Sequence, residues 1–341
     1  MSDIIDKIKE AGLTGRGGAG FPVWQKWSAV RGEPCVLNDK GICKYVICNV
    51  SEGEPGVRKD AYLLEKYPEK VIAGMVLAIE AVENAEGIIY LNHNYYRRYG
   101  KKIMEIIKDK KIIIFEKPEE AGYIGGEESA LLNVIEGKRA EPRLKPPFPV
   151  TSGLFGKPTI INNVETFYNA CLVYEGSYKG NRFYTLGGEV KRPGVYEFGE
   201  KENIKKILEE TGNMPSFPFF VQVGGDGSGT VLDEDQLETP ATGAGSIKVF
   251  NKNKVKPKKI IFDWLNFFAS ESCGQCTACR EGTYRLREII DAKNPNWKMF
   301  KDLLDNLADT SFCGLGAVVP TPIYSYIKNV LKKDLDNFQG L

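Results

Sequence analysis

The sequence predicts an α/β protein that continues into a small second domain and ends in helices. In its first half, short apolar runs alternate with amphipathic helical patterns, as in the β-α-β units of a parallel sheet. Glycine-rich turns and short strands follow, and after residue 260 only helical periodicity remains. We therefore expect three domains, over 1–177, 178–256 and 257–341.

The composition is that of a soluble globular protein. The chain has 341 residues, of which 42% are hydrophobic and 27% charged, and it can bury a sizeable core. Its net charge of +1 gives no reason to expect a nucleic-acid partner. No apolar run approaches the roughly 18–20 residues that span a bilayer, and the first residues lack a signal-peptide pattern. We expect a cytoplasmic protein without direct membrane insertion.

Histidine and cysteine usage narrows the chemistry. The single histidine, His93, disfavours catalysis by several histidines and is expected as a surface or core imidazole. Any catalysis should therefore draw on a cofactor. Eight cysteines are too few for a disulfide scaffold, and Cys48 and Cys171 are expected as small core residues.

A glycine loop follows a short helix expected over 3–11. Gly15, Gly17 and Gly20 match G-x-G-x-x-G, but the loop follows a helix, whereas a Rossmann fingerprint follows a strand. Backbone N–H groups of such a loop can approach a phosphate, and Arg16 and Lys26 would add positive charge. A plain turn is the alternative. The aromatic residues that come next, Phe21, Trp24 and Trp27, could stack on a flat ring or lie in the core.

The predicted sheet ends in an acidic turn. Strands are expected over 45–49, 87–91 and 111–115, with helices over 69–82 and 95–108. Glu52 and Glu54 follow the first strand, at the edge where parallel sheets bind ligands. Because carboxylates repel phosphate, we expect them to meet ribose hydroxyls, a nicotinamide amide or a flavin N–H. A solvated acidic turn is the alternative.

Two further segments carry polar residues where a helix begins. Glu127 and Glu128 follow two glycines, so free N–H groups there could bind an anionic or carbonyl ligand, or the acids could simply favour the helix dipole. Asn162 and Asn163 could cap a helix that runs to about residue 174, or could bind a ligand. Between them, the prolines of 142–149 form a stiff, extended segment.

The second domain and the C-terminal part follow. The second domain should contain a hairpin over 187–198, a helix over 203–210, strands over 219–223 and 246–250, and a glycine-rich loop over 224–229 to which we assign no chemistry. Helices are then expected over 262–270, 283–293, 297–307 and 323–333.

Four cysteines form the strongest chemical signal. Cys273, Cys276 and Cys279 have the spacing C-x2-C-x2-C, and Cys313 is the only later cysteine. An evenly spaced trio with a distant fourth thiolate suits a [4Fe–4S] cluster. A structural zinc ion with four thiolates is the rival interpretation, although zinc sites more often pair two C-x2-C knuckles.

Together these motifs resemble one family. They are Gly15-Arg-Gly-Gly-Ala-Gly-Phe-Pro22, Asn49-x2-Glu-x-Glu-Pro-Gly56, Tyr123-Ile-x-Gly-Glu-Glu128, Pro146-Pro-Phe-Pro149 with Asn162-Asn-Val-Glu-Thr166, and the cysteine loop of 271–282 with Cys313. In this order the chain resembles the NADH-binding flavoprotein subunit of respiratory complex I and the diaphorase subunits of NAD-linked or electron-bifurcating hydrogenases and formate dehydrogenases. The resemblance covers residues 10 to 335.

The resemblance implies a fold and cofactors. It implies a Rossmann-like domain with FMN and NAD(H), a ubiquitin-like (SLBB) domain, and a four-helix bundle whose four cysteines hold a [4Fe–4S] cluster. The residues implied to hold FMN are Gly15, Gly17, Lys26, Asn49, Tyr123, Gly126, Glu127, Asn162, Asn163 and Thr166. Those implied to lie towards NADH are Phe21, Phe148, Glu52, Glu54 and Glu128.

The resemblance also implies a reaction and partners. NADH would pass a hydride to FMN, and single electrons would leave through the cluster to a thioredoxin-like [2Fe–2S] subunit and a further iron–sulfur, hydrogenase or dehydrogenase subunit. The chain departs from the family pattern at Ser51, Ala278 and Ala29. We also expect it to lack the additional thioredoxin-like and ferredoxin domains of some relatives. The reverse flux towards NAD(P)+ and a zinc-stabilised scaffold remain alternatives.

Overall fold

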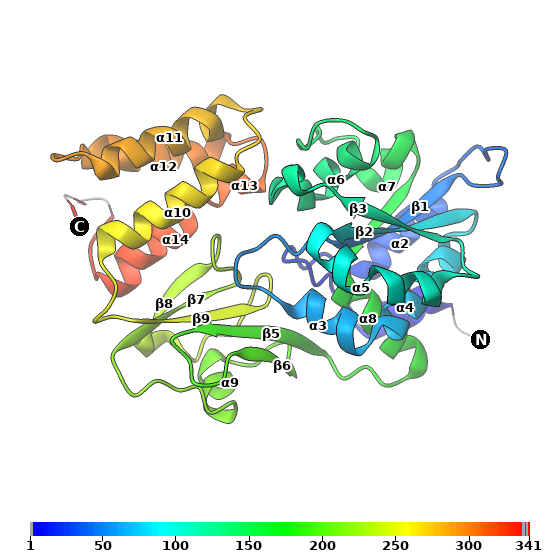
Figure 1. Ribbon diagram of the computed structural model, residues 1–341, viewed down its shortest axis with the longest axis horizontal. Coiled ribbons are helices and arrows are strands. Elements are labelled where there is room, and N and C mark those ends of the chain that lie inside the picture. The colour runs from blue at the N-terminus through cyan, green and yellow to red at the C-terminus, as the bar shows by residue number, and fades with distance from the viewer. Residues whose placement is uncertain (1–2, 336–337, 339) are drawn as a thin grey trace. The chain divides into compact units, whose positions relative to one another are not determined.

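Four parallel strands form the first sheet, in the order β3-β2-β1-β4. They belong to a computed structural model that describes residues 3–335, 338, 340 and 341 (Figure 1). The strands are β1 (Lys44–Val50), β2 (Ala85–Asn92), β3 (Ile112–Lys117) and β4 (Thr159–Asn163). The predicted parallel α/β sheet is therefore confirmed, and β4 is an additional strand that was not predicted from the sequence.

Helices and short turns connect these strands. The helices are α1 (Ile4–Glu10), α2 (Val23–Gly32), α3 (Lys59–Lys66), α4 (Pro68–Val82), α5 (His93–Ile107), α6 (Glu128–Ile135), α7 (Pro149–Ser152) and α8 (Val164–Glu175). The 3-10 turns are η1 (Glu119–Ala121), η2 (Ile124–Gly126) and η3 (Leu154–Gly156). Helices α4 and α8 pack so closely that a Cβ on Gly74 would lie 1.9 Å from the Phe167 carbonyl oxygen. Leu131 and Leu132 of α6 are buried in a cluster with Ile47 of β1.

The chain divides into two compact units. Residues 1–53 and 58–183 form the first, and residues 54–57 and 184–341 form the second. The second unit contains a five-stranded mixed sheet in the order β6-β5-β9-β7-β8. Its elements are β5 (Asn181–Gly188), β6 (Gly194–Gly199), α9 (Ile204–Glu210), β7 (Phe219–Val223), β8 (Thr230–Asp233), η4 (Glu234–Gln236) and β9 (Ser246–Asn251). The expected hairpin corresponds to the neighbouring strands β5 and β6.

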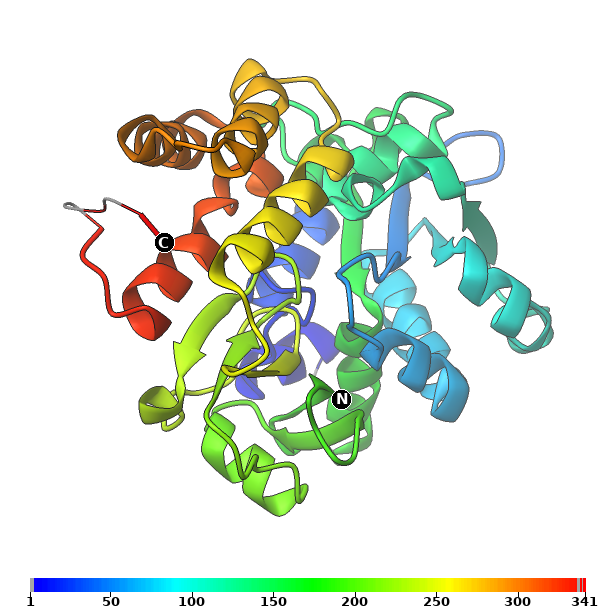
Figure 2. The same ribbon diagram turned by 60° about the vertical axis from the view of Figure 1, so that its left-hand side comes forward.

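Helices complete the second unit (Figure 2). They are α10 (Pro257–Glu271), α11 (Thr277–Asp291), α12 (Trp297–Thr310), α13 (Gly314–Ala317) and α14 (Pro320–Ser325), followed by the π-helical turn η5 (Tyr326–Val330). Helix α11 begins at Thr277, earlier than expected, so it includes Cys279. The helix expected over 323–333 is instead α14 and η5, because Pro320 and Pro322 permit a start at the first turn. None of the helices within the described residues is long and apolar enough to cross a membrane.

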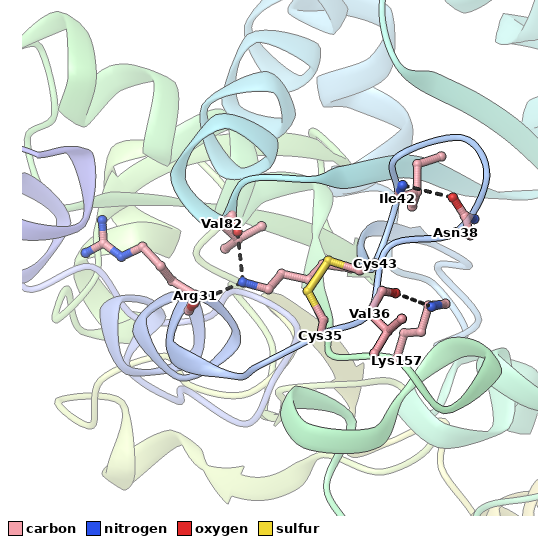
Figure 3. The surroundings of a disulfide bond; sticks show 9 residues. Arg31, Cys35, Val36, Asn38, Ile42, Cys43, Val82 and Lys157 are labelled. Carbon is pink, nitrogen blue, oxygen red and sulfur yellow. Dashed lines mark hydrogen bonds between the residues drawn. A yellow bond between two sulfur atoms is a disulfide. The ribbon is translucent and has the colours of Figure 1, made fainter.

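A disulfide bond joins Cys35 and Cys43 (Figure 3). No pairing of these two cysteines was predicted from the sequence. The bond closes the loop that leads into β1, and the Lys157 ammonium holds this loop through the Val36 carbonyl oxygen at 3.2 Å. Cys48 and Cys171 are buried free thiols, as expected.

Candidate functional site

The first sheet reverses its strand order between β1 and β4. From β1 the chain proceeds outwards to β2 and β3, and it then returns to place β4 on the other side of β1. Open α/β sheets bind ligands at such a switch, outside the carboxyl ends of the strands. Asn49 of β1 lies in register with Asn163 of β4 at this edge. Two of the predicted ligand residues therefore come together.

Asn49 joins two predicted segments. Its side-chain Nδ2 donates to the Gly126 carbonyl oxygen at 2.9 Å, and its Oδ1 accepts from the Ser51 hydroxyl at 2.6 Å. A Cβ on Gly126 would lie 2.5 Å from Ser51 Oγ. Similarly, a Cβ on Gly53 would lie 3.2 Å from the ring of Tyr123. The turn after β1 and the turn at η2 thus pack together through glycines.

The glycine loop is fixed to the start of α8. The Gly15 N–H donates to the Phe21 carbonyl oxygen at 2.8 Å and closes the loop, and the Arg16 N–H donates to Thr166 Oγ1 at 2.9 Å. A Cβ on Gly17 would lie 3.5 Å from Asn163 Cβ. The predicted residues Gly15, Gly17, Asn163 and Thr166 are therefore neighbours.

The outer part of the loop leaves its backbone uncovered. Gly18 and Gly20 have φ angles of +116° and +65°, which favour glycine, and a Cβ at either position would meet no atom within 4 Å. Backbone N–H groups in such a loop can approach a phosphate group. The loop therefore fits a phosphate-bearing cofactor such as FMN.

Contrary to the expectation from the sequence, the Arg16 side chain does not add its positive charge to the glycine loop. Only 1% of its surface is exposed, and its guanidinium donates to the Tyr178 hydroxyl at 2.8 Å and to Thr14 Oγ1 at 3.3 Å. The prediction that this charge faces a phosphate is wrong, because the guanidinium is buried within the protein. The backbone N–H of Arg16 instead ties the loop to α8.

Four charged residues form a chain of ion pairs beside this edge. Lys26 Nζ donates to the Ile161 carbonyl oxygen at 3.1 Å and lies 3.4 Å from the Glu128 carboxylate. Lys145 Nζ lies 2.8 Å from Glu128 Oε1 and 2.9 Å from Glu127 Oε1. Although burial opposes it, the Lys26 and Lys145 cations hold the pKa of Glu128 below its ordinary value. Glu128 is therefore an anion with two cationic neighbours.

Glu127 is the N-cap of α6. Its carboxylate accepts from the N–H groups of Ser129 and Ala130 at 2.8 and 2.9 Å. These bonds occupy Oε2, while Lys145 contacts Oε1. In this structure Glu127 positions the helix start, which agrees with the alternative interpretation of these acids as helix-terminal residues.

The Asn162 side chain forms a hydrogen bond within the protein core. Its Oδ1 accepts from the buried Trp27 indole N–H at 2.9 Å. Trp27 is fully buried, so of its two interpretations the core residue is confirmed. By contrast, Phe21 and Phe148 are 50% and 53% exposed, so both rings present apolar surface to solvent.

Sequence reasoning missed a buried ionic cluster at Asn163. Lys59 Nζ lies 2.7 Å from Asp60 Oδ1, 3.2 Å from Glu165 Oε2 and 2.9 Å from Asn163 Oδ1. All three charged side chains are at most 3% exposed. A glutamate near the start of the largely apolar helix Val164–Glu175 was the available signal, because acids are rarely buried without a partner.

Glu52 turns towards α3. Its carboxylate accepts from the N–H groups of Asp60 and Ala61 at 2.7 and 3.0 Å and from the Tyr95 hydroxyl at 2.6 Å. Burial raises the pKa of Glu52 to about 7, and the Asp60 carboxylate adds to the rise. Both carboxylate oxygens therefore have protein donors.

Glu54 belongs to the second unit together with Pro55, Gly56 and Val57. Its Oε1 accepts from the N–H groups of Gly227 and Ser228 at 2.9 and 3.0 Å. The glycine-rich loop of 224–229, to which we assigned no chemistry, thus holds a carboxylate. A Cβ on Gly225 would lie 2.3 Å from Glu54 Oε1, so the carboxylate would have to shift to admit a side chain there.

Three of the four candidate metal ligands lie at helix starts in the second unit, and the fourth, Cys273, lies just after the end of α10. Cys276 is the N-cap of α11, Cys279 lies in its first turn, and Cys313 is the N-cap of α13. Burial raises the pKa of Cys279 to about 11, and the charges of the other three thiolates, including Cys273, add to the rise. The four thiols are therefore electrostatic neighbours.

Zinc and iron–sulfur centres make different demands on four thiol ligands. Among the described residues, no group of three or more His, Cys, Asp or Glu side chains is close enough to hold a single metal ion. A tetrahedral zinc ion needs four sulfurs at about 2.3 Å from one point. A [4Fe–4S] cluster takes one thiolate at each of four irons, so its ligands stand farther apart. Four cysteine thiols are the donor set that such a cluster takes.

A buried hydroxyl also fits a cluster. Ser311 Oγ is buried and has no hydrogen-bond partner among the described residues. It would lie 2.3 Å from a Cβ on Gly316, and the same Cβ would lie 3.2 Å from Cys279 Cβ. An acceptor such as a cluster sulfur would satisfy this hydroxyl.

Two family models match the chain. The Nuo51 FMN-binding domain matches residues 8–171, and the NADH-ubiquinone oxidoreductase-F iron-sulfur binding region matches residues 259–333. The first contains the glycine loop and the β1–β4 edge, and the second contains all four candidate metal ligands.

Similar proteins come from two kinds of complex. An NADH-quinone oxidoreductase subunit of Streptomyces coelicolor is 33% identical over 96% of this chain and 81% of the relative. NAD-reducing hydrogenase HoxS subunit alpha of Cupriavidus necator is 33% identical over 95% of this chain and 59% of the relative. The crystal structure of an NAD+-reducing [NiFe]-hydrogenase in the H2-reduced state contains a chain with a TM-score of 0.85 and 32% identity. The match covers 98% of this chain but only 61% of that one.

Proposed function

Because this chain belongs to the family of FMN-binding, iron–sulfur subunits found in NADH-quinone oxidoreductases and NAD-reducing hydrogenases, we propose that its β1–β4 edge is where NADH meets FMN. Family membership makes it a flavin-dependent NADH oxidoreductase subunit with an FMN-binding domain and a 4Fe–4S binding region. When bound, FMN accepts a hydride and the cluster accepts single electrons. The chain binds and orients these groups and excludes water from them.

The observation that carries this site is the switch in strand order. It brings Asn49, Asn163 and the uncovered backbone of the glycine loop to one edge of the sheet. Free N–H groups bind a phosphate, and amide side chains bind the polar edge of an isoalloxazine ring. Exposed aromatic rings pack against a second nucleotide. The Gly126 carbonyl oxygen and the Ser51 hydroxyl fix the orientation of the Asn49 amide.

We assign the flavin side of the site first. The residues that we propose to contact FMN are Gly15, Gly17, Lys26, Asn49, Tyr123, Gly126, Asn163 and Thr166. Asn162, Glu127 and the Arg16 backbone support them by holding β4, α6 and the loop in place.

The nucleotide side uses aromatic and acidic residues. Phe21 and Phe148 present exposed rings against which a nucleotide base could pack. Glu128 carries a negative charge between two lysines, which suits hydroxyl or amide donors of NADH. Glu52 and Glu54 already accept protein N–H groups, so we propose that they shape the turn after β1 and reach NADH only through their remaining acceptor capacity.

In the second unit we assign the cluster to Cys273, Cys276, Cys279 and Cys313. We further propose that the mixed sheet of β5–β9 is the ubiquitin-like (SLBB) domain and that α10, α11, α12 and α14 form the four-helix bundle. A zinc-stabilised scaffold is a poorer account, because the family model for this region is an iron–sulfur binding region.

A second function uses the same site with reversed flux. The TM-score of 0.85 to a chain of an NAD+-reducing hydrogenase supports reduction of NAD(P)+ with electrons from a partner. In either direction we expect a cytoplasmic complex with a thioredoxin-like [2Fe–2S] subunit and a further iron–sulfur, hydrogenase or dehydrogenase subunit.

Purification from the native cells tests this assignment. We expect a tagged chain to bring down iron–sulfur subunits, identified by mass spectrometry, and to contain FMN with four irons and acid-labile sulfide. A hydrogenase or formate dehydrogenase subunit in the complex would favour NAD(P)+ reduction, and quinone-reducing membrane subunits would favour NADH oxidation. A monomer that contains neither flavin nor iron would contradict the proposal.

A further inference from the structure

The amide of Asn163 is almost fully used by the protein. Its Oδ1 accepts from Lys59 Nζ at 2.9 Å and from the Glu165 N–H at 3.0 Å. Its Nδ2 donates to Asp60 Oδ2 at 2.7 Å. Since an amide nitrogen carries two hydrogens, one N–H remains for a ligand. The orientation of this N–H is set by the two charged neighbours.

Those neighbours are themselves fixed. Lys59 is enclosed by Asp60 and Glu165, and Glu165 Oε1 also accepts from the Phe183 N–H at 2.8 Å. Although burial alone would lower it, Asp60, Glu165 and Glu52 raise the pKa of Lys59 above its ordinary value. The ammonium is therefore charged, and Asn163 is attached to a rigid, ionised group.

The charges of these three side chains do not sum to zero. Counted by formal charge, one lysine and two acidic residues, Lys59, Asp60 and Glu165 sum to −1. They are almost completely buried, so solvent screens this charge poorly. Reduction of a nearby flavin adds negative charge, which a negative neighbour opposes.

We propose that Lys59 and Asp60 are positioning residues for the flavin: they fix the Asn163 amide and place a net negative charge beside the FMN site. The proposal rests on the function proposed above, because it takes Asn163 as an FMN ligand. It predicts two separate effects. Changes in either residue should weaken FMN binding, and a change in the charge should move the flavin potential.

The first variant is Asp60→Asn. It removes one buried negative charge and replaces the acceptor for Asn163 Nδ2 with a side chain that can also present N–H groups. We expect the dissociation constant for FMN, measured by fluorescence titration of the flavin-free protein, to rise at least tenfold. We expect the midpoint potential of the bound flavin to become more positive.

The second variant is Lys59→Met, and its matched control is Lys44→Met. Lys44 is also a buried lysine of the first unit, and its Nζ donates to the carbonyl oxygens of Arg31 and Val82 at 2.9 and 3.0 Å. It begins β1, at the end of the strand opposite Asn49. We expect Lys59→Met to weaken FMN binding and shift the potential negatively, and Lys44→Met to change neither.

The outcomes separate the two proposals. If the wild-type chain binds no FMN, the proposed function fails, and this inference fails with it. If the wild type binds FMN but Asp60→Asn binds it equally well at an unchanged potential, only this inference is overturned. Equal weakening by Lys44→Met would also overturn it, because the effect would then be general destabilisation. If Lys59→Met does not fold, the result for Asp60→Asn decides.

Discussion

The Tyr95 hydroxyl donates a 2.6 Å hydrogen bond to Oε2 of Glu52, the carboxylate that also caps the start of α3. Burial raises the pKa of Glu52 to about 7, against about 4.3 in an unfolded chain. The folded protein therefore keeps a proton that the unfolded chain has lost. This contribution to stability is complete below pH ~4.3 and disappears as the pH rises through about 7.

Glu52→Gln should remove this pH dependence. Between pH 5 and pH 7, the free energy of unfolding of the wild type should fall relative to the variant, by at most about 1.4 kcal/mol per pH unit. Urea denaturation at several pH values measures the difference. Tyr95→Phe is the control, because it keeps the carboxyl group and should keep the slope. A wild-type–variant difference that is constant with pH would contradict the assignment.

The disulfide between Cys35 and Cys43 should stabilise the first unit without affecting cofactor binding. The cysteines are separated by 8 positions, so loss of the bond should cost about 2 kcal/mol through the entropy of the unfolded chain. Cys43 directly precedes β1, and the site lies at the other end of that strand, roughly 20 Å away by strand geometry. The double variant Cys35→Ser/Cys43→Ser should melt earlier but bind FMN as the wild type does. Weakened FMN binding at a temperature where the variant is folded would show that the two ends are coupled.

Loss of one cysteine ligand should remove or convert the cluster. In Cys313→Ser we expect fewer than four irons per chain, as measured by metal and acid-labile sulfide analysis, because one iron loses its thiolate. The control is Cys171→Ser, which changes a buried thiol of the first unit. It should keep four irons. One zinc ion per wild-type chain, lost in Cys313→Ser, would instead identify a structural zinc site.

Ser311→Ala should lower the midpoint potential of the cluster. The buried hydroxyl of Ser311 has no partner within the described part of the chain, and a hydrogen bond to a cluster sulfur would stabilise the more negative reduced state. A redox titration followed by electron paramagnetic resonance measures the shift. Thr310→Ala is the adjacent control, since Thr310 Oγ1 donates to the Asn306 carbonyl oxygen at 2.7 Å. If Ser311→Ala and Thr310→Ala had the same cluster midpoint potential, Ser311 would not reach the cluster.

The sequence predicted local elements better than it predicted their ends. Strand β7 (Phe219–Val223) has the predicted bounds, because a short, largely apolar run has few other structures available. Helix α11 starts earlier than predicted, because residues 277–282 were assigned to the cysteine loop and not to the helix that follows it. Strand β4 was missed because its two asparagines are typical of helix caps, and Asn163 is indeed the cap of α8.

The candidate site was predicted where ligands follow one another in sequence. The cysteine spacing and the asparagine pair are local patterns. By contrast, Lys59 and Asn163 are 104 positions apart, and Arg16 and Tyr178 are 162 positions apart. No spacing rule relates such partners, so neither the buried cluster nor the Tyr178 partner of Arg16 could be predicted. Tertiary packing determines both the buried ionic cluster and the partners of the Arg16 side chain.

Anaerobic titration of the purified, cofactor-loaded chain with NADH tests the central claim most directly. The visible absorbance of the flavin reports its reduction, and no partner subunit is required. We predict that NADH bleaches this absorbance in the wild type and in Cys313→Ser, because hydride acceptance at the β1–β4 edge does not depend on the cluster. A flavin absorbance that NADH leaves unchanged in the wild type would contradict the account.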